Sequence, residues 1–371
     1  MSTNPEARAW LRISAAALTE NYARLRSAVG PDAGIIPMVK ADAYGLGMPE
    51  VVRALRSASP WGWGVATLAE GLRLTELGLD EPVVVFSPLM EAELEPALRA
   101  GLHISVSSLE ALEGVIVACR RTGSRAHVHV DVDTGMGRTG FDWRLASDWM
   151  PRVVEVAREG FEWVGCFTHL HSAEHDKPSV REQWARFDEA LGFLDAPPSG
   201  LLIHGLNSAG AFSVPGHARG AIRPGIFMYG GAVGPAHPMP VAVVSLHARV
   251  CLVRSVEAGT TLGYGGTYRA GGPERWATVA VGYGDGVPRA LGNRGHALLK
   301  GRRVPIIGRI SMDLTVVDIS DLPGVRVGDI ATLLGTDGRE EITLDEMAEL
   351  AGTISYELLT GFTPRLPRIW T

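Results

Sequence analysis

The chain is poor in cysteine, with three in 371 residues. Cys119, Cys166 and Cys251 are widely spaced, and each has apolar neighbours. An odd number at such spacing argues against both a disulfide framework and a cysteine-ligated zinc site. We therefore expect reduced thiols in the core and assign them no chemical role.

Long hydrophobic runs are also missing. No stretch of about 18 apolar residues runs uninterrupted, and the polar residues 1–8 are not followed by an apolar segment of signal-peptide length. These absences argue against a membrane-spanning or a secreted protein. We expect a cytoplasmic protein with no membrane partner.

The chain has no excess of positive charge, since its formal net charge is −6 at pH 7. It also lacks a cluster of Lys and Arg interleaved with aromatic residues, which a nucleic-acid surface requires. We therefore expect no nucleic-acid partner.

Eight short apolar runs alternate with helix-like stretches between residues 34 and 224, and eight is the strand count of a closed parallel barrel. The runs are Ile35–Val39, Trp63–Ala66, Val83–Phe86, His103–Val106, Ala126–Val132, Trp163–Thr168, Leu201–His204 and Ala221–Arg223. Capping boxes at Thr67–Glu70, Ser107–Glu110 and Ser179–Glu182 indicate helix starts. Helical spacing over 18–29, followed by Gly30, indicates one more helix before the first strand.

The pattern changes after about residue 240, where strands are separated by Gly and Pro turns. The expected strands are Val241–Arg254, Trp276–Gly282, His296–Lys300, Val304–Asp318 and Val327–Leu334, and only Leu344–Ala351 looks helical. A chain of this length usually needs two cores. We predict an α/β fold: a (β/α)8 TIM-type barrel over 10–238 and a C-terminal mostly-β domain over 239–371, with Gly231–Pro240 as the linker.

Two features point to chemistry at the carboxyl ends of the barrel strands, where such barrels place their active sites. Lys40 ends the first strand. Desolvation at that position lowers the pKa of a lysine, which can then act as an amine nucleophile or a base. The alternative is a lysine whose amine simply reaches the solvent. Asn207 and Ser208 follow strand seven and Arg223–Ile226 follows strand eight, so both loops are candidates for holding an anion with uncharged donors. A plain helix cap is the alternative for Asn207 and Ser208.

Three motifs resemble those of the alanine racemase family, enzymes of fold type III that use pyridoxal 5′-phosphate (PLP). They are Val39–Gly45, similar to the PLP-lysine signature, Asp133–Arg138, similar to the central motif, and Arg223–Gly230, similar to the segment that closes the barrel. The resemblance covers nearly the whole chain. It implies a homodimer with shared active sites, acting on a small amino acid and supplying D-alanine for peptidoglycan.

The resemblance also implies a role for individual residues. Lys40 would hold PLP as a Schiff base and act as the base on one face of the substrate, and Tyr264 would act from the partner subunit on the other face. Arg223 would hydrogen-bond the pyridine nitrogen, which a guanidinium keeps unprotonated. The remaining expected cofactor contacts are Tyr44, His169, Asn207, Ser208, Gly225, Ile226 and Tyr356. The expected substrate-end residues are Arg138, Met312, Asp313 and the entryway residue Tyr283.

Asp131 departs from the family pattern. Many relatives carry, seven residues before the arginine of the central motif, a lysine that becomes carbamylated and so gains negative charge. Because Asp131 is already a carboxylate, we expect it to pair with Arg138 directly or through water. An ordinary solvated aspartate is the alternative.

Other functions remain open at this stage. Within racemases, serine or a broader range of amino acids is the alternative to alanine. A fold type III decarboxylase shares the PLP lysine, although there an acidic residue would be expected where Arg223 stands. A PLP-carrier protein is the non-enzyme alternative, but it would not need Tyr264. Histidines in 169–176 also suggest a metal, which PLP chemistry does not require, so we expect none.

Overall fold

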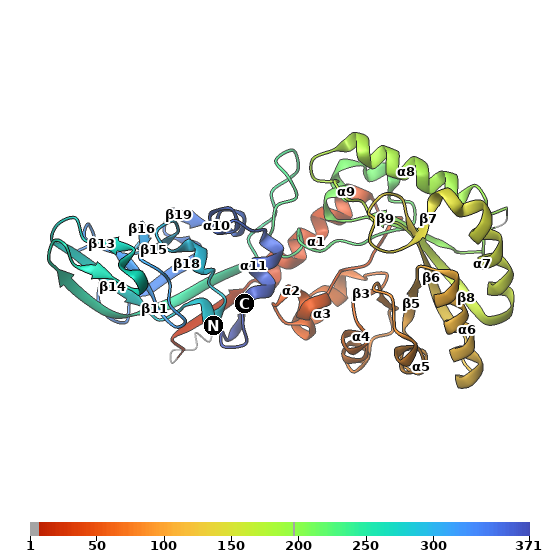
Figure 1. The fold of residues 1–371 in the computed structure, drawn as a ribbon, viewed down its shortest axis with the longest axis horizontal. Helices are drawn as coiled ribbons and strands as arrows, with labels where there is room; N and C mark the ends of the chain where they lie inside the picture. Colours follow the sequence, from red (N-terminus) through yellow and green to blue (C-terminus); the bar gives the residue numbers. More distant parts are fainter. Residues whose placement is uncertain (1–6, 196) are drawn as a thin grey trace.

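The computed structural model describes residues 7–195 and 197–371. A barrel surrounded by helices lies beside a smaller β-rich domain, and the described ends of the chain are both at the β-rich domain (Figure 1). None of the described helices is long and apolar enough to cross a membrane.

Eight parallel strands form the barrel. They are β2 (Gly34–Ile35), β3 (Trp63–Val65), β4 (Val83–Val85), β5 (His103–Val106), β6 (Ala126–Asp133), β8 (Phe161–Phe167), β9 (Leu202–Leu206) and β10 (Ala221–Ile222). Their order is β2-β10-β9-β8-β6-β5-β4-β3, and a parallel bridge from Met38 to Gly64 joins the two ends. Each of the eight expected runs overlaps one strand, and the TIM-type barrel is confirmed.

Helices follow most strands and cover the outside of the barrel (Figure 1). They are α1 (Ala15–Val29), α3 (Met48–Leu55), α4 (Leu68–Thr75), α5 (Glu91–Arg99), α6 (Leu109–Thr122), α7 (Ala146–Gly160), α8 (Lys177–Leu191) and α9 (Ser208–Ser213). The capping box at Thr67 is confirmed. The other two were wrong: α6 is capped by Ser108, and α8 by Asp176, because another side chain that can accept the free backbone N–H groups lies closer to the helix start.

The second domain is mostly β, as expected. Its main strands are β11 (Val244–Val256), β14 (Glu274–Val279), β15 (His296–Leu299), β16 (Arg302–Ile307), β17 (Thr315–Asp318), β18 (Ile330–Asp337) and β19 (Glu340–Ile342), followed by α10 (Leu344–Ala351) and α11 (Ser355–Gly361). The single strand expected over Val304–Asp318 was wrong, because Gly308, with φ of +69°, ends β16 and a loop precedes β17.

The sheet of this domain includes both ends of the chain. Strand β1 (Ala9–Ile13) pairs antiparallel with β11 and parallel with β20 (Arg368–Trp370), a pairing that the sequence analysis did not predict. The cysteines are free, and Cys119 and Cys166 are buried as expected. Cys251 is exposed on β11, so the expectation of a core position for it was wrong.

Candidate active site

A cavity of about 620 Å³ opens at the carboxyl ends of the barrel strands. Helix α11 of the β domain forms part of its wall. The sequence-predicted residues that line it are Lys40, Tyr44, Asp131, Arg138, His169, Asn207, Ser208, Arg223, Gly225, Ile226 and Tyr356. Segments from five βα units and from α11, far apart in the sequence, therefore meet at one site.

Lys40 begins α2 (Lys40–Tyr44), a turn with unusual backbone geometry. Residues Ala41–Tyr44 all have φ between 52° and 57°, and Gly45 has φ of 80°. The left-handed region costs an L-residue about 1–2 kcal/mol, so surrounding contacts must hold this turn. One of them is Glu70, whose carboxylate accepts from the Ala41 amide at 2.7 Å and from the Ala66 amide at 2.8 Å. The strained turn therefore fixes the position of Lys40 after the first barrel strand, β2.

The electrostatic environment of Lys40 disfavours its charged form relative to a lysine in water. Burial lowers its pKa below the ordinary value, and the positive charge of Arg138 lowers it further, against an opposing effect of Glu70 and with a smaller contribution from Arg223. A lysine with a lowered pKa can serve as a nucleophile or a base near neutral pH.

Arg223 is buried beside the cavity, and protein acceptors hold both of its terminal nitrogens. Nη1 donates to His204 Nδ1 at 2.7 Å and to the His204 carbonyl at 2.9 Å, and Nη2 donates to the Thr168 carbonyl at 2.7 Å. Burial lowers the pKa of Arg223 to about 10, so it remains a cation at neutral pH. Nε–H has no hydrogen-bond partner among the described residues, which leaves one donor for a ligand.

His169 lies beside Arg223 at the cavity, and its surroundings favour the neutral ring. Its Nδ1 is 3.4 Å from Arg223 Nη2. Burial, with the charges of Arg223, Arg138 and Lys40, lowers its pKa to about 3. In the described part of the chain, no group of three or more His, Cys, Asp or Glu side chains is placed to hold a metal ion.

Three hydroxyl groups could donate to an anion at one end of the cavity. The Tyr44 and Tyr356 rings are 6.1 Å apart, and Ser208 Oγ accepts from the Gly225 amide at 2.9 Å, which leaves its own hydrogen free. A Cβ at Gly225 would come within 2.1 Å of the Tyr44 hydroxyl, so this position needs glycine. Asn207 is the N-cap of α9, with its side chain accepting from the Gly210 amide.

Asp131 is buried, and its partners are hydroxyl groups. Oδ2 accepts from Thr139 at 2.8 Å and from Ser107 at 3.5 Å, and burial raises its pKa to about 6. Arg138 lines the same cavity and forms no ion pair with Asp131 or any other residue the structure describes. Its guanidinium is therefore available to a carboxylate ligand.

The other expected residues lie elsewhere on the same chain. Tyr264, Tyr283 and Met312 are 70%, 41% and 51% exposed, and neither they nor Asp313 line the cavity. Tyr264 begins a short 3₁₀ turn in the β domain, as does Tyr283. Within one chain they are too far from the Lys40 cavity to form part of its wall.

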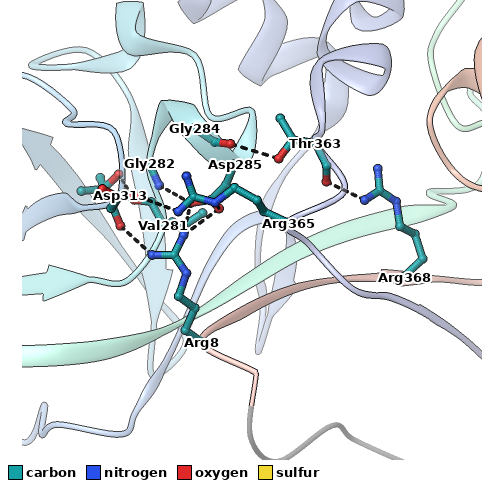
Figure 2. Close-up of polar contacts among 10 residues, drawn as sticks. Arg8, Val281, Gly282, Gly284, Asp285, Asp313, Thr363, Arg365 and Arg368 are labelled. Atoms are coloured by element: carbon teal, nitrogen blue, oxygen red, sulfur yellow. Dashed lines mark hydrogen bonds and ion pairs between the residues drawn. The ribbon is translucent and has the colours of Figure 1, made fainter.

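A network of polar contacts fixes the loops that carry Tyr283 and Asp313 (Figure 2). The buried Asp285 carboxylate accepts from Arg8 at 2.7 and 2.9 Å, from the Gly282 amide at 2.9 Å and pairs with Arg365 at 3.1 Å. Arg365 also binds Asp313 at 2.5 Å. These contacts hold the two loops together within one chain.

The sequence analysis missed several residues of the cavity wall. They include Glu70, Met136, Thr139, Ile354, Glu357 and Thr360. Glu70 was recognised only as part of a capping box, and its second contact, to Ala41, depends on the fold. Helix α11 carries Glu357 and Thr360, and Ile354 is its N-cap. That helix had no clear start signal in the sequence.

The comparisons with known proteins agree with this geometry. A model of the alanine racemase N-terminal domain matches residues 13–233, and one of the C-terminal domain matches residues 243–370. The alanine racemase of Syntrophobacter fumaroxidans is 35% identical over 358 residues, which cover 95% of this chain and 94% of the relative. That of Cutibacterium acnes is 36% identical, covering 96% of each chain.

Solved structures are similar over the same span. The alanine racemase of E. faecalis gives a TM-score of 0.91 at 31% identity, covering 100% of both chains. The Bartonella henselae alanine racemase, solved with covalently bound pyridoxal phosphate, gives 0.89 at 29% identity, covering 98% of this chain and all of the other. With a family model matching each domain and relatives aligned along nearly its whole length, the chain belongs to the alanine racemase family.

Proposed function

We propose that this protein is a PLP-dependent racemase that interconverts L-alanine and D-alanine. One observation carries the proposal: Lys40, with a lowered pKa, shares its cavity with the Arg223 Nε–H, which has no acceptor among the described residues. A pyridine aldehyde phosphate requires an amine that can react with its aldehyde and a donor for its ring nitrogen, and Lys40 and Arg223 would supply these two groups.

The residues of the cavity fit the cofactor. Lys40 would be the point of covalent attachment, and Arg223 would donate a hydrogen bond to the ring nitrogen. Tyr44, Ser208 and Tyr356 would supply uncharged donors for the phosphate. When bound, PLP acts as an electron sink that acidifies the α-hydrogen of an attached amino acid.

The side chains divide the remaining work. Arg138 binds the substrate carboxylate, since its guanidinium has no competing ion pair among the described residues. Lys40 Nζ removes or returns the α-proton on one face, for which burial lowers its pKa in the required direction. Racemisation needs a second proton carrier on the opposite face. Among the described residues, the tyrosines that line the cavity are Tyr44 and Tyr356, and both are assigned to the phosphate.

We infer that a second copy of the chain supplies this carrier, Tyr264, and that the protein acts as a homodimer. Tyr264 is 70% exposed, as expected of a group that becomes ordered against a partner. Tyr283, Met312 and Asp313, which the Asp285 network positions, would line the substrate entrance of the partner's cavity. The cytoplasmic location stays a prediction from the sequence.

Exchange of the α-proton tests the activity. Purified protein with PLP is incubated with a panel of L-amino acids in deuterated water, and α-deuteration and the D-enantiomer are measured by NMR and chiral chromatography. We expect both products from alanine. Failure to exchange the α-proton of any amino acid, despite borohydride-sensitive PLP on Lys40, would contradict the proposal. Release of CO₂ with a deuterated amine would instead indicate a decarboxylase.

Complementation tests the shared site. Lys40→Ala and Tyr264→Phe are each expected to be inactive, and a mixture of the two subunits has one intact site in each heterodimer. Random pairing should therefore restore about a quarter of the wild-type activity per site. No recovery in mixed dimers would contradict the placement of Tyr264 in the partner's site.

A further inference from the structure

Three buried histidines form a line inside the barrel that ends on Arg223. His103 is the first residue of β5, His129 lies within β6 and His204 within β9. His103 Nδ1 is 3.1 Å from His129 Nε2, and His129 Nδ1 is 3.0 Å from His204 Nε2. With the 2.7 Å contact from His204 Nδ1 to Arg223 Nη1, the chain of hydrogen bonds crosses the barrel from its amino-terminal end to the cavity.

Gly165 on β8 makes the central contact possible. Strand β8 lies between β6 and β9, so the His129 and His204 rings must meet across it. A Cβ at Gly165 would be 2.1 Å from His129 Nδ1, and only glycine leaves room for this ring. The Phe167 ring stacks on His204 with 5.1 Å between ring centroids, and the Trp61 ring lies edge-on to His129 with 6.2 Å between centroids. These contacts fix the two histidine rings.

The guanidinium determines where every proton of the chain lies. Because Arg223 can only donate, His204 Nδ1 must accept and its hydrogen sits on Nε2. His129 then accepts at Nδ1 and donates from Nε2 to His103 Nδ1. All three rings are neutral in this arrangement. Burial supports it, since it lowers the pKa of His129 and His204 and that of His103 to about 4.

We propose that His103 and His129 are positioning residues, which hold His204 in the one tautomer that accepts from Arg223 and so keep the guanidinium oriented toward the cofactor ring. A proton added at His103 Nδ1 would reverse each bond in turn and place a hydrogen on His204 Nδ1, facing a donor. Loss of the acceptor nitrogen of His103, at the other end of the chain of hydrogen bonds, would let His129 and then His204 change tautomer. Arg223 would then lose the acceptor that fixes Nη1. The part of this inference that concerns catalysis rests on the proposed function, whereas the protonation of the rings does not.

The proton positions can be read directly in the wild-type protein. Histidine is labelled with nitrogen-15, and the ring nitrogens are observed by NMR in the full-length protein with and without PLP. We expect His129 and His204 to remain neutral, with hydrogen on Nε2, between about pH 5 and pH 8, where an ordinary imidazole titrates. Hydrogen on Nδ1 of either ring, or titration in that range, would overturn the proposal.

Two substitutions at His103 separate the hydrogen bond from packing. His103→Leu removes the acceptor for His129, while His103→Asn places an amide oxygen where Nδ1 stood. We expect His103→Leu to lower kcat about tenfold, similar to the loss of a supporting hydrogen bond behind a metal ligand, and to weaken PLP binding. His103→Asn should stay within about twofold of wild type.

The controls keep each outcome distinct. His127 stacks on His103 at 4.6 Å but has no hydrogen bond in the chain, so His127→Gln should leave kcat and the His204 signals unchanged. Equal losses in the Leu and Asn variants, or wild-type kcat and ring signals in both, would overturn the proposal. Absence of racemase activity in the wild type with the expected ring signals would refute the proposed function alone.

Discussion

Ala41→Gly should stabilise the protein, although alanine-to-glycine changes in helices normally destabilise. Ala41 has φ of 52° and ψ of 48°, and its side chain is exposed. Glycine removes a left-handed strain of about 1–2 kcal/mol and adds an unfolded-state entropy cost of about 0.5–1 kcal/mol. The expected net gain is about 0.5–1 kcal/mol. The hydrogen bond from the Ala41 amide to Glu70 is retained, because glycine keeps the N–H.

Ala23→Gly is the matched control. Ala23 is also exposed, but it lies within the right-handed helix α1, where the same change costs about 1 kcal/mol. The two variants are compared by urea unfolding at one saturating PLP concentration, because bound ligand adds to stability by mass action. Their stabilities should differ by about 1.5–2 kcal/mol. If Ala41→Gly is as destabilising as Ala23→Gly, the turn after Lys40 does not store the strain that its geometry indicates.

Three further predictions concern other contacts. Asp285→Ala should destabilise by about 3 kcal/mol and should raise KM for alanine, because it leaves the buried Gly282 amide without its acceptor and removes the carboxylate that pairs with Arg8 and Arg365. Asp329→Ala is the control, because it removes a partly exposed pair with Lys300 and should cost under about 1 kcal/mol. Equal urea midpoints for the two variants would contradict this prediction. Burial raises the pKa of Asp131 from 3.8 to about 6, so the folded state binds more protons than the unfolded state and loses about 3 kcal/mol of stability as pH rises from about 4 to about 7. Asp131→Asn should remove this loss of stability, measured by urea unfolding at several pH values. An unchanged pH dependence of stability in the variant would contradict the prediction. Tyr356→Phe should weaken PLP binding by about 10- to 100-fold in a fluorescence titration, because one hydrogen bond to a charged group is lost. Unchanged PLP affinity would show that Tyr356 does not bind the phosphate.

Several features of the site could be predicted from the sequence because they depend on local patterns. Eight apolar runs indicated the barrel, and Lys40 and Arg223 were placed at strand ends by counting along those runs. Barrel geometry then implied that their side chains share one end. The roles assigned to Tyr264 and Asp131 came from motifs, and they stay predictions until the variants are measured.

Other features follow from contacts between segments distant in sequence. Ser108 and Asp176 replaced nearby serines as helix caps, because the start of each helix is set by how it packs on the barrel. Strand β1 lies in the β domain because β11 offers it an antiparallel edge, which its five residues do not indicate. The exposure of Tyr264 away from its own cavity is likewise a property of the fold.

The sequence by itself determined the barrel, the β domain and the types of chemical group at the strand ends, because periodicity and strand order are local. Only the tertiary structure decided that His103, His129 and His204 form one chain, since it brings three strands together and leaves space at Gly165 for a ring to cross the fourth. The same holds for the left-handed turn at Ala41–Tyr44, whose strain is tolerated because distant contacts, such as that from Glu70, hold it. Residue types follow from the sequence, but proton positions and strain depend on neighbours that only folding supplies.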